Sequence, residues 1–266
     1  MSELFVHRYG VEGGAPLLAI HGVSAHGRRF LPMAPLAFPE ADVLAPDLRG
    51  HGRSPSDAPS TIERHVEDLL GVLDRAKVEQ AVVVGHSYGA CIATHLLSHA
   101  PDRVRCVVLL DPAMALPSAR AQEMSDGMLA GDIGYATLND LVVARRLGRS
   151  APAIVHSDAD TRLAGVEGPT GWKTPWDRSV VEQAWREMAR PMPALPTPRP
   201  TLLVEATQAK LVSDFQRNHL QTELGDSLDT VAVDLGHMLY WDDLDASCAV
   251  VGEFLARHAP DAVVSR

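Results

Sequence analysis

The pentapeptide GHSYG at residues 85–89 constrains this chain more than any other feature, because it joins two apolar segments of different periodicity. Residues 81–84 (AVVV) predict a buried strand, and residues 88–99 predict an apolar helix. A serine between two glycines at such a junction predicts a sharp strand-to-helix turn, with the hydroxyl standing above the edge of a sheet. We therefore predict that Ser87 is a nucleophile located at the positive end of a helix.

Strand-like and helix-like segments alternate along most of the chain. The predicted strands are mostly continuous apolar runs, which is typical of strands covered on both faces. They lie at residues 17–20, 43–45, 81–84, 104–110, 201–204 and 230–233. Helical spacing is found at residues 62–75, 88–99, 211–224 and 243–258. This alternation predicts an α/β fold, with a mostly parallel central sheet and helices on both of its faces.

One long segment, residues 113–199, interrupts the alternation. It contains no clear strand, and it ends in the proline-rich run PMPALPTPRP, which must be extended. We predict that this segment is a helical cap inserted into a core that is formed by residues 1–112 and 200–266. The alternative is that this segment is an ordinary surface connection between core elements.

Composition narrows the class of protein. The formal net charge of −10 repels phosphate backbones and anionic lipid headgroups, so we expect neither nucleic acid nor a membrane as a partner. Three widely spaced cysteines without a CxxC motif argue against a disulfide framework or a zinc site. The N-terminus has no signal-peptide pattern, and no apolar stretch is long enough to span a bilayer. A cytoplasmic enzyme is the expectation.

A loop that could stabilise an oxyanion follows the first predicted strand. It has the sequence HGVSAHG at residues 21–27 and should face the nucleophile. We predict that the backbone N–H groups of Val23 and Tyr88 form the oxyanion hole. His21 and Ser24 are expected to contact the substrate, although a loop-orienting role for His21 is the alternative. A metal pair formed with His26 is disfavoured, and no metal site is predicted.

The general base must follow the last core strand of such a sheet. Residues 231–238 (VAVDLGHM) supply a strand, a glycine and His237. This histidine is the one best placed to return to the carboxyl edge of the sheet, so we predict that it activates Ser87.

These motifs, together with residues 45–54 (APDLRGHGRS), resemble the α/β-hydrolase family over nearly the whole chain. In that family the segment at 45–54 shapes the loop beneath the active site and is not catalytic. The phrases VVLLDPA and LGHM and the HGVSAHG loop resemble most closely the small actinobacterial lipase-like esterases. The resemblance implies the α/β-hydrolase fold and serine chemistry, but one fold hosts many activities, so it does not define the substrate.

The resemblance leaves two places for the acid of the triad. Family members usually carry an Asp a few residues after the strand at 201–204, and the corresponding position here is Ala209. Some relatives carry the acid at the tip of the preceding strand, which is Asp111 in this chain. We assign Asp111 as the acid, with Glu205 and Asp214 as alternatives. If Asp111 is not the acid, its position before Pro112 suits a residue that only forms a turn.

The resulting set predicts an acyl-enzyme mechanism. Ser87 attacks an acyl carbonyl, His237 takes the proton, and Asp111 orients the imidazole of His237. The mechanism requires no metal and no organic cofactor. A serine at the turn excludes the aspartate-nucleophile chemistry of dehalogenases and epoxide hydrolases. Activity should rise from mildly acidic to neutral pH, because the base must be neutral.

Small carboxylic esters with short to medium acyl chains are the predicted substrates. Trp172 and Trp176 of the cap are assigned to substrate binding, with Trp185, Met188 and Met192 as further apolar candidates; packing of the cap onto the core is the alternative role. Thioesterases, lactonases, C–C bond hydrolases and cofactor-free perhydrolases share the same residue set. These activities stay open, as does a ligand receptor with slow turnover.

Overall fold

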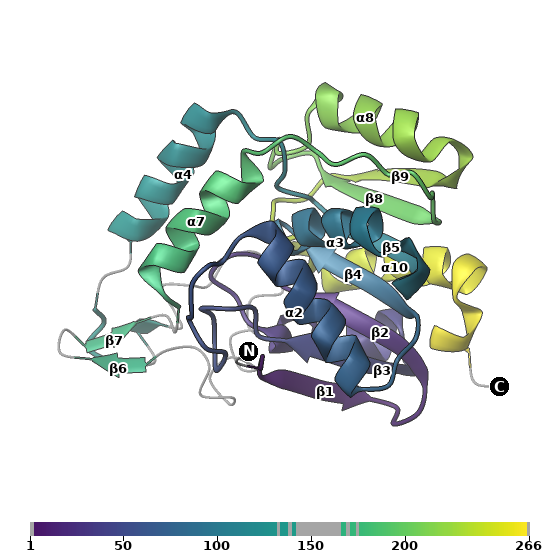
Figure 1. The fold of residues 1–266 in the computed structure, drawn as a ribbon, viewed down its shortest axis with the longest axis horizontal. Coiled ribbons are helices and arrows are strands. Elements are labelled where there is room, and N and C mark those ends of the chain that lie inside the picture. Colours follow the sequence, from purple (N-terminus) through teal and green to yellow (C-terminus); the bar gives the residue numbers. More distant parts are fainter. Residues whose placement is uncertain are drawn as a thin grey trace.

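The computed structural model describes residues 3–131, 134–137, 140–141, 166–168, 171–173 and 176–264. The strands of its main sheet are β1 (Val6–Gly10), β2 (Ala15–Ile20), β3 (Ala41–Pro46), β4 (Ala81–His86), β5 (Val104–Leu110), β8 (Thr201–Ala206) and β9 (Leu228–Val233). They lie in the order β1-β3-β2-β4-β5-β8-β9 (Figure 1). Every neighbouring pair is parallel except β1 with β3, which confirms the predicted mostly parallel sheet.

Burial explains which strands could be predicted. All residues of β3 and β4 are buried, so both strands consist largely of apolar residues. Strand β1 lies at the edge and alternates between partly buried and exposed positions (VHRYG), so it carries no apolar run. It was missing from the predicted set for this reason.

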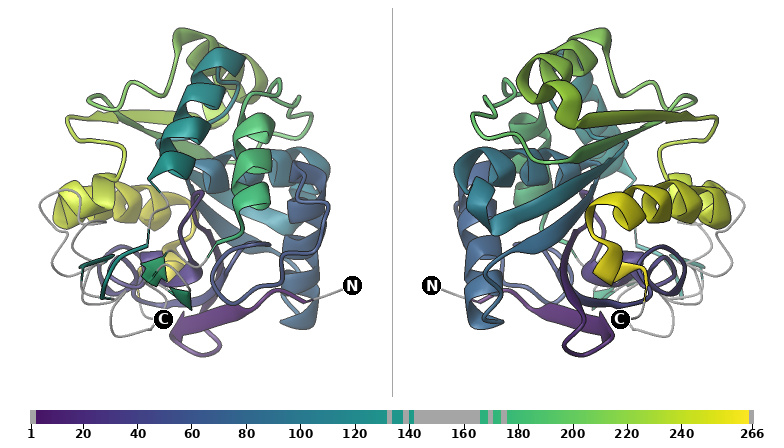
Figure 2. Two further views of the ribbon diagram at one scale, coloured as in Figure 1. Left: turned by 90° about the vertical axis from the view of Figure 1, so that its left-hand side faces the viewer. Right: turned by 90° about the vertical axis from the view of Figure 1, so that its right-hand side faces the viewer.

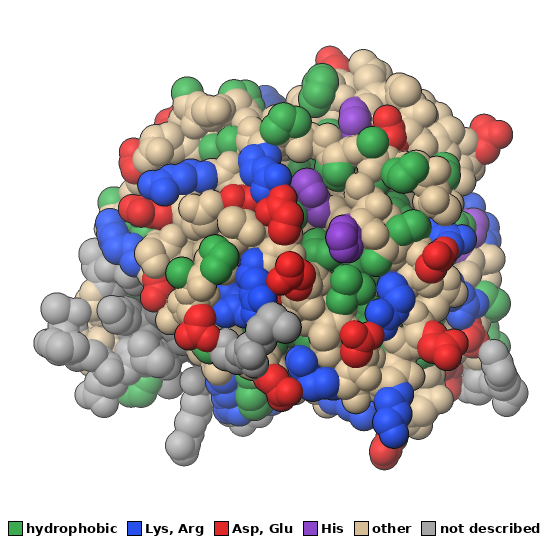
Figure 3. Space-filling view, viewed as in Figure 1, with side chains coloured by type: hydrophobic (Ala, Val, Ile, Leu, Met, Phe, Trp, Pro, Cys, Tyr) green, Lys and Arg blue, Asp and Glu red, His purple; other side chains and the backbone are tan. Residues whose placement is uncertain are grey.

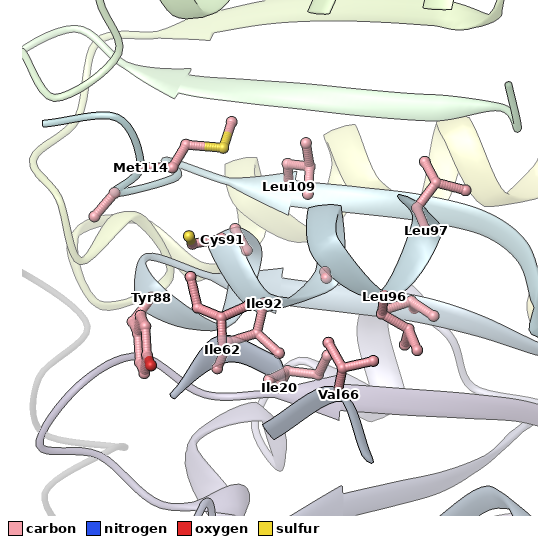
Figure 4. Close-up of a cluster of buried hydrophobic side chains, with 14 of the residues drawn as sticks. Ile20, Ile62, Val66, Tyr88, Cys91, Ile92, Leu96, Leu97, Leu109 and Met114 are labelled. Carbon is pink, nitrogen blue, oxygen red and sulfur yellow. The ribbon is translucent and has the colours of Figure 1, made fainter. Parts of the chain in front are cut away.

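Helices cover both faces of the sheet and bury two apolar clusters. The helices outside the predicted cap are α1 (Ala34–Ala37), α2 (Ile62–Arg75), α3 (Tyr88–His99), α8 (Asp214–Leu224), α9 (Leu239–Asp242) and α10 (Leu244–His258). Helices α2, α3 and α8 contribute to the cluster on one face, and α1 and α10 to the cluster on the other (Figure 2). Figure 4 shows Ile20 and Leu109 of the sheet near Ile92 and Leu96 of α3.

In the described part of the predicted cap, the helices α4 (Ser118–Ala130) and α7 (Arg178–Met188) lie side by side (Figures 1 and 2). This part also contains a short antiparallel hairpin of β6 (Val166–Gly168) and β7 (Gly171–Lys173). The expectation that this segment has no strand was therefore wrong, since strands this short carry no readable pattern. Residues 142–165 lie outside the described residues, and the division into core and cap stays a prediction.

A polar network joins α7 to the start of α2. The buried Glu187 carboxylate accepts the Ile62 N–H at 3.1 Å and pairs with Arg190 at 2.6 Å. Arg190 also pairs with Glu63 at 2.6 Å. This network therefore joins the predicted cap to the core near the N-terminal end of α2.

Charged side chains lie on the surface, whereas the cysteines lie in the interior. Figure 3 shows acidic and basic side chains interspersed over one face of the molecule. Cys91, Cys106 and Cys248 are buried free thiols. Among the residues that the structure describes, no helix combines the length and the hydrophobicity needed to cross a bilayer.

Candidate active site

Ser87 occupies the turn between β4 and α3 in a backbone conformation that L-residues rarely adopt, with φ of 56° and ψ of −118°. The flanking glycines make the turn possible. A Cβ atom at Gly85 would lie 2.5 Å from the Gly89 carbonyl oxygen, and one at Gly89 would lie 2.0 Å from the Ile20 carbonyl oxygen. Strand and helix therefore approach too closely for any side chain at these two positions, as the pentapeptide predicts.

The structure brings Ser87, His237 and Asp111 together. Ser87 Oγ lies 2.9 Å from His237 Nε2, and His237 Nδ1 lies 2.6 Å from Asp111 Oδ2. With the proton on Nδ1, the imidazole donates to Asp111 and accepts the Ser87 hydroxyl hydrogen bond. This is the hydrogen-bond order required for a serine nucleophile, a histidine base and an orienting acid.

Asp111 is fully buried just beyond the tip of β5, at a positive φ of 40°. Its Oδ1 atom accepts the Ala206 N–H at 3.1 Å, which leaves Oδ2 for His237. The alternative acids are engaged elsewhere, since Glu205 and Asp214 pair with Arg217 at 2.6 and 2.5 Å. The geometry therefore favours Asp111 over both alternatives.

His86 makes a second connection to the base, which the sequence did not suggest. Its Nε2–H donates to the His237 carbonyl at 2.9 Å, and the two imidazole rings lie 4.8 Å apart between centroids. Burial, followed by the neighbouring His237, lowers the pKa of His86 to about 3. His86 is therefore neutral at neutral pH and does not repel a protonated His237.

The loop after β2 runs beside the nucleophile. A Cβ atom at Gly22 would lie 3.0 Å from Cβ of Ser87, so the backbone of this loop passes close to the reacting side chain. Val23 and Ser24 line the same cavity as Ser87. Tyr88 is the first residue of α3, where backbone N–H groups lack partners within the helix. The loop and the helix start are thus adjacent, as an oxyanion hole requires.

His21 lies away from this cavity and holds the loop instead. It is fully buried, donates from Nδ1 to the Gly22 carbonyl at 2.7 Å, and accepts the Leu48 N–H on Nε2 at 2.9 Å. Both ring nitrogens are engaged, so the structure does not bring His21 to the substrate side of the loop. His26, at the other end of the loop, is buried as well.

The segment at 45–54 supports the same loop through Asp47. The buried Asp47 carboxylate accepts the Gly27 N–H at 2.8 Å and pairs with His7 at 2.9 Å. Burial by itself raises the pKa of Asp47, but these hydrogen bonds and the charge of His7 outweigh it and lower the pKa to about 2. Asp47 thus ties the loop to the edge strand β1, a supporting role of the kind that the resemblance implied.

A cavity of about 530 Å³ opens above Ser87, within the range typical of small-molecule sites. Residues on the sheet side are Gly22, Val23, Ser24, Ala25, Arg29, His86, Ser87, Ala113, His237, Met238 and Trp241. Residues on the cap side and near it are Met124, Gly127, Met128, Gly131, Trp176, Trp185 and Leu211. The lining is mainly apolar, and Arg29 is the one residue with a permanent charge among the described residues that form it.

The cap contributes other residues to this cavity than the sequence suggested. Trp176 lines it as expected, and so does Trp185. Trp172 lies in β7, where its backbone pairs with Tyr135, and it is not among the described residues of the lining. Met188 is fully buried in the apolar core instead.

Two comparisons with known proteins identify the family. Residues 15–160 match the family described as alpha/beta hydrolase fold. Lipase LipV of Mycobacterium tuberculosis (strain ATCC 25618 / H37Rv) is 38% identical over 243 residues, which cover 89% of this chain and 92% of the lipase. The chain belongs to the α/β-hydrolase family. The resemblance predicted from its motifs is therefore confirmed.

Solved structures of other hydrolases share this fold. An E-2-(acetamidomethylene)succinate hydrolase superposes with a TM-score of 0.82 at 21% identity, covering 95% of this chain and 94% of that one. A marine microorganism esterase superposes with a TM-score of 0.77 at 20% identity, covering 96% and 100%. Both place the chain among α/β hydrolases in fold.

The roles of His86 and of the cavity residues of α4 could not be predicted from the sequence of this hydrolase. His86 precedes the nucleophile within the pentapeptide, so its position was visible, but its partner is 151 residues away. Helix α4 buries only Ala121, Ser125 and Leu129, and this narrow face gives a weak helical pattern. No local signal indicated that its methionines face the nucleophile.

Proposed function

We propose that this α/β hydrolase is a serine esterase that cleaves carboxylic esters with short to medium acyl chains. The observation that carries the proposal is the hydrogen-bonded series from Ser87 through His237 to Asp111 at the floor of an apolar cavity. The named lipase with 38% identity supports ester hydrolysis as the class of reaction.

Acylation follows from the proposed roles. His237 removes the Ser87 proton as Oγ attacks the carbonyl carbon of the ester, and Asp111 stabilises the imidazolium that forms. The carbonyl oxygen becomes an oxyanion, for which the Val23 and Tyr88 N–H groups are the proposed donors. The tetrahedral intermediate then collapses, His237 protonates the departing alkoxide, and an alcohol leaves.

Deacylation repeats these steps with water. His237 takes a proton from water, and the resulting hydroxide attacks the acyl carbon bonded to Ser87 Oγ. His237 returns the proton to Ser87 as the acid is released. The tie between His86 and the His237 carbonyl holds the base in one position through both halves of the cycle.

The cavity supports an apolar acyl group as the recognised part of the substrate. Each methylene buried against its lining contributes about 0.8 kcal/mol until the cavity is filled. Trp176 and Trp185 supply large apolar surfaces, and Met124 and Met128 supply adaptable ones. Ser24, at the rim of the same cavity, is proposed as a polar contact.

The experiment is a hydrolysis series of nitrophenyl esters from acetate to decanoate at pH 8. We expect kcat/KM to rise with chain length and then to fall within this range. Failure to cleave every ester in the series would overturn the esterase proposal and favour a hydrolase of narrower specificity or a slow-turnover receptor.

A further inference from the structure

One face of α4 forms a wall of the active-site cavity. Met124, Gly127, Met128 and Gly131 follow the spacing i, i+3, i+4 and i+7, and all four line the cavity that contains Ser87. The buried residue Leu129, on a different face of the helix, belongs to the main apolar cluster. The helix therefore presents alternating thioether side chains and glycines to the space above the nucleophile.

Gly127 differs from the glycines of the nucleophile turn. It lies inside α4, where a glycine is less favourable than an alanine by about 1 kcal/mol. Its φ is not positive, and a Cβ atom built there meets no atom of the described residues within 4 Å. Neither backbone conformation nor packing against the described residues requires a glycine at this position. Gly127 is exposed and lines the cavity, so the missing side chain leaves open space at its rim.

We propose that Gly127, because it lacks a side chain, admits the longer acyl chains, which lie along the face of α4 between Met124 and Met128. This inference rests on the proposed esterase function. In the wild-type protein the chain passes over Gly127 without obstruction and is buried against the two methionines. A larger side chain at position 127 would occupy this path, whereas the shortest acyl groups would bind beside Ser87 without reaching it.

The test compares Gly127→Leu with the wild-type protein on nitrophenyl esters of increasing chain length. Burial favours each methylene by about fourfold, so blocking the path of the last three methylenes should lower kcat/KM about 50-fold for the chain length that the wild-type protein cleaves best. The value for acetate should change less than about threefold. Gly127→Ala should lie between the two proteins.

Gly71 provides the matched control, because it is also a helical glycine but lies in α2 outside the cavity. A Cβ atom there meets only the end of the flexible Arg75 side chain at 3.3 Å, so Gly71→Leu should fold. It should leave the chain-length profile unchanged. An equal loss for all esters in Gly127→Leu, or an unchanged profile, would overturn the proposal.

Alkyl fluorophosphonates separate this inference from the esterase proposal, because they label a nucleophilic serine without turnover. Gly127→Leu should slow labelling of Ser87 by a decyl reagent while labelling by an ethyl reagent stays the same. If Gly127→Leu slows labelling by the decyl reagent alone and no ester is hydrolysed, the role of Gly127 is supported and the esterase proposal is refuted. If esters are hydrolysed but Gly127→Leu leaves the labelling rates of both reagents unchanged, the esterase proposal is supported and the role of Gly127 is refuted.

Discussion

The two walls of the active-site cavity are held by different interactions. On the sheet side, Ser87, His237 and Asp111 are fixed by hydrogen bonds between elements far apart in the sequence. On the cap side, α4 and α7 pack against each other, and α7 is joined to α2 by the hydrogen bond from Ile62 N–H to Glu187 and by the ion pairs of Arg190 with Glu187 and Glu63. Catalysis requires positions accurate to fractions of an ångström, which hydrogen bonds supply, whereas an apolar wall tolerates variation. We infer that the sheet side defines the chemistry and the cap side the selectivity.

The largest effect on the sheet side is expected when the nucleophile is removed. Ser87→Ala should reduce kcat by a factor on the order of 10⁶, the scale of such a loss in serine hydrolases. It should also abolish labelling by a fluorophosphonate probe. Ser98→Ala is the control, because Ser98 lies on the same helix but donates to the Ala194 carbonyl away from the cavity. Labelling of the Ser87→Ala protein at the wild-type level would refute the assignment.

Removing the charge of the acid should have the next largest effect. Asp111→Asn keeps the size of the side chain but disturbs the orientation and tautomer of His237, so kcat should fall by about 10⁴. Steady-state kinetics should show little change for Glu205→Gln and Asp214→Asn, which alter residues paired with Arg217. The assignment fails if either of these variants is crippled while Asp111→Asn stays active.

The core should also be sensitive to acid, through the buried His65 of α2. Burial lowers the pKa of His65 to about 3, whereas a histidine in the unfolded chain has a pKa of about 6.5. Between these values the unfolded chain binds one more proton at this residue, so stability is complete above pH 6.5 and falls as the pH falls. The contribution is about 1.4 kcal/mol per pH unit.

Urea unfolding from pH 7 to 5 measures this slope directly. His65→Leu should flatten it by the contribution of one histidine, while His99→Leu, which changes an exposed residue of α3, should leave the slope unchanged. An identical slope for His65→Leu and the wild-type protein would show that His65 is not one of the groups that link pH to folding.

The smallest effect is expected where α7 joins the core. The hydrogen bond from Arg190 lowers the pKa of Glu63 to about 2, so this connection persists above about pH 4.5 and is lost as the pH falls toward 2. Because the pair is largely exposed, Glu63→Gln should cost less than about 1 kcal/mol at pH 7. Hydrogen exchange of the α7 amides should quicken by no more than about fivefold.

Glu67→Gln is the matched control for this effect. Glu67 lies one turn further along α2 and pairs with Arg64 of the same helix, so it does not contact α7. Equal acceleration of hydrogen exchange in α7 for the two variants would show that Glu63 does not stabilise the position of α7. The proposed difference between the two cavity walls would then lose part of its support.

The choice between acids shows where prediction from the sequence ended. Strands β5 and β8 are neighbours and end at the same edge, so Asp111 and Glu205 both were candidates for one histidine. Side chains alternate along a strand, and Glu205 is directed to Arg217 of α8. Asp111, just beyond its strand, turns toward His237 and gains the Ala206 N–H. The deciding contacts depend on strand pairing rather than on either local sequence.

The sequence by itself determined the α/β architecture, the nucleophile turn and the position of His237. These features depend on apolar runs of buried strands and on a few adjacent residues, such as Gly85 and Gly89, whose side chains would collide with their neighbours. The tertiary structure alone decided the tie from His86 to His237 and the role of α4 as a cavity wall. Contacts between residues more than a hundred positions apart, and the orientation of a helix with a weak apolar pattern, arise only from the packing of the whole chain.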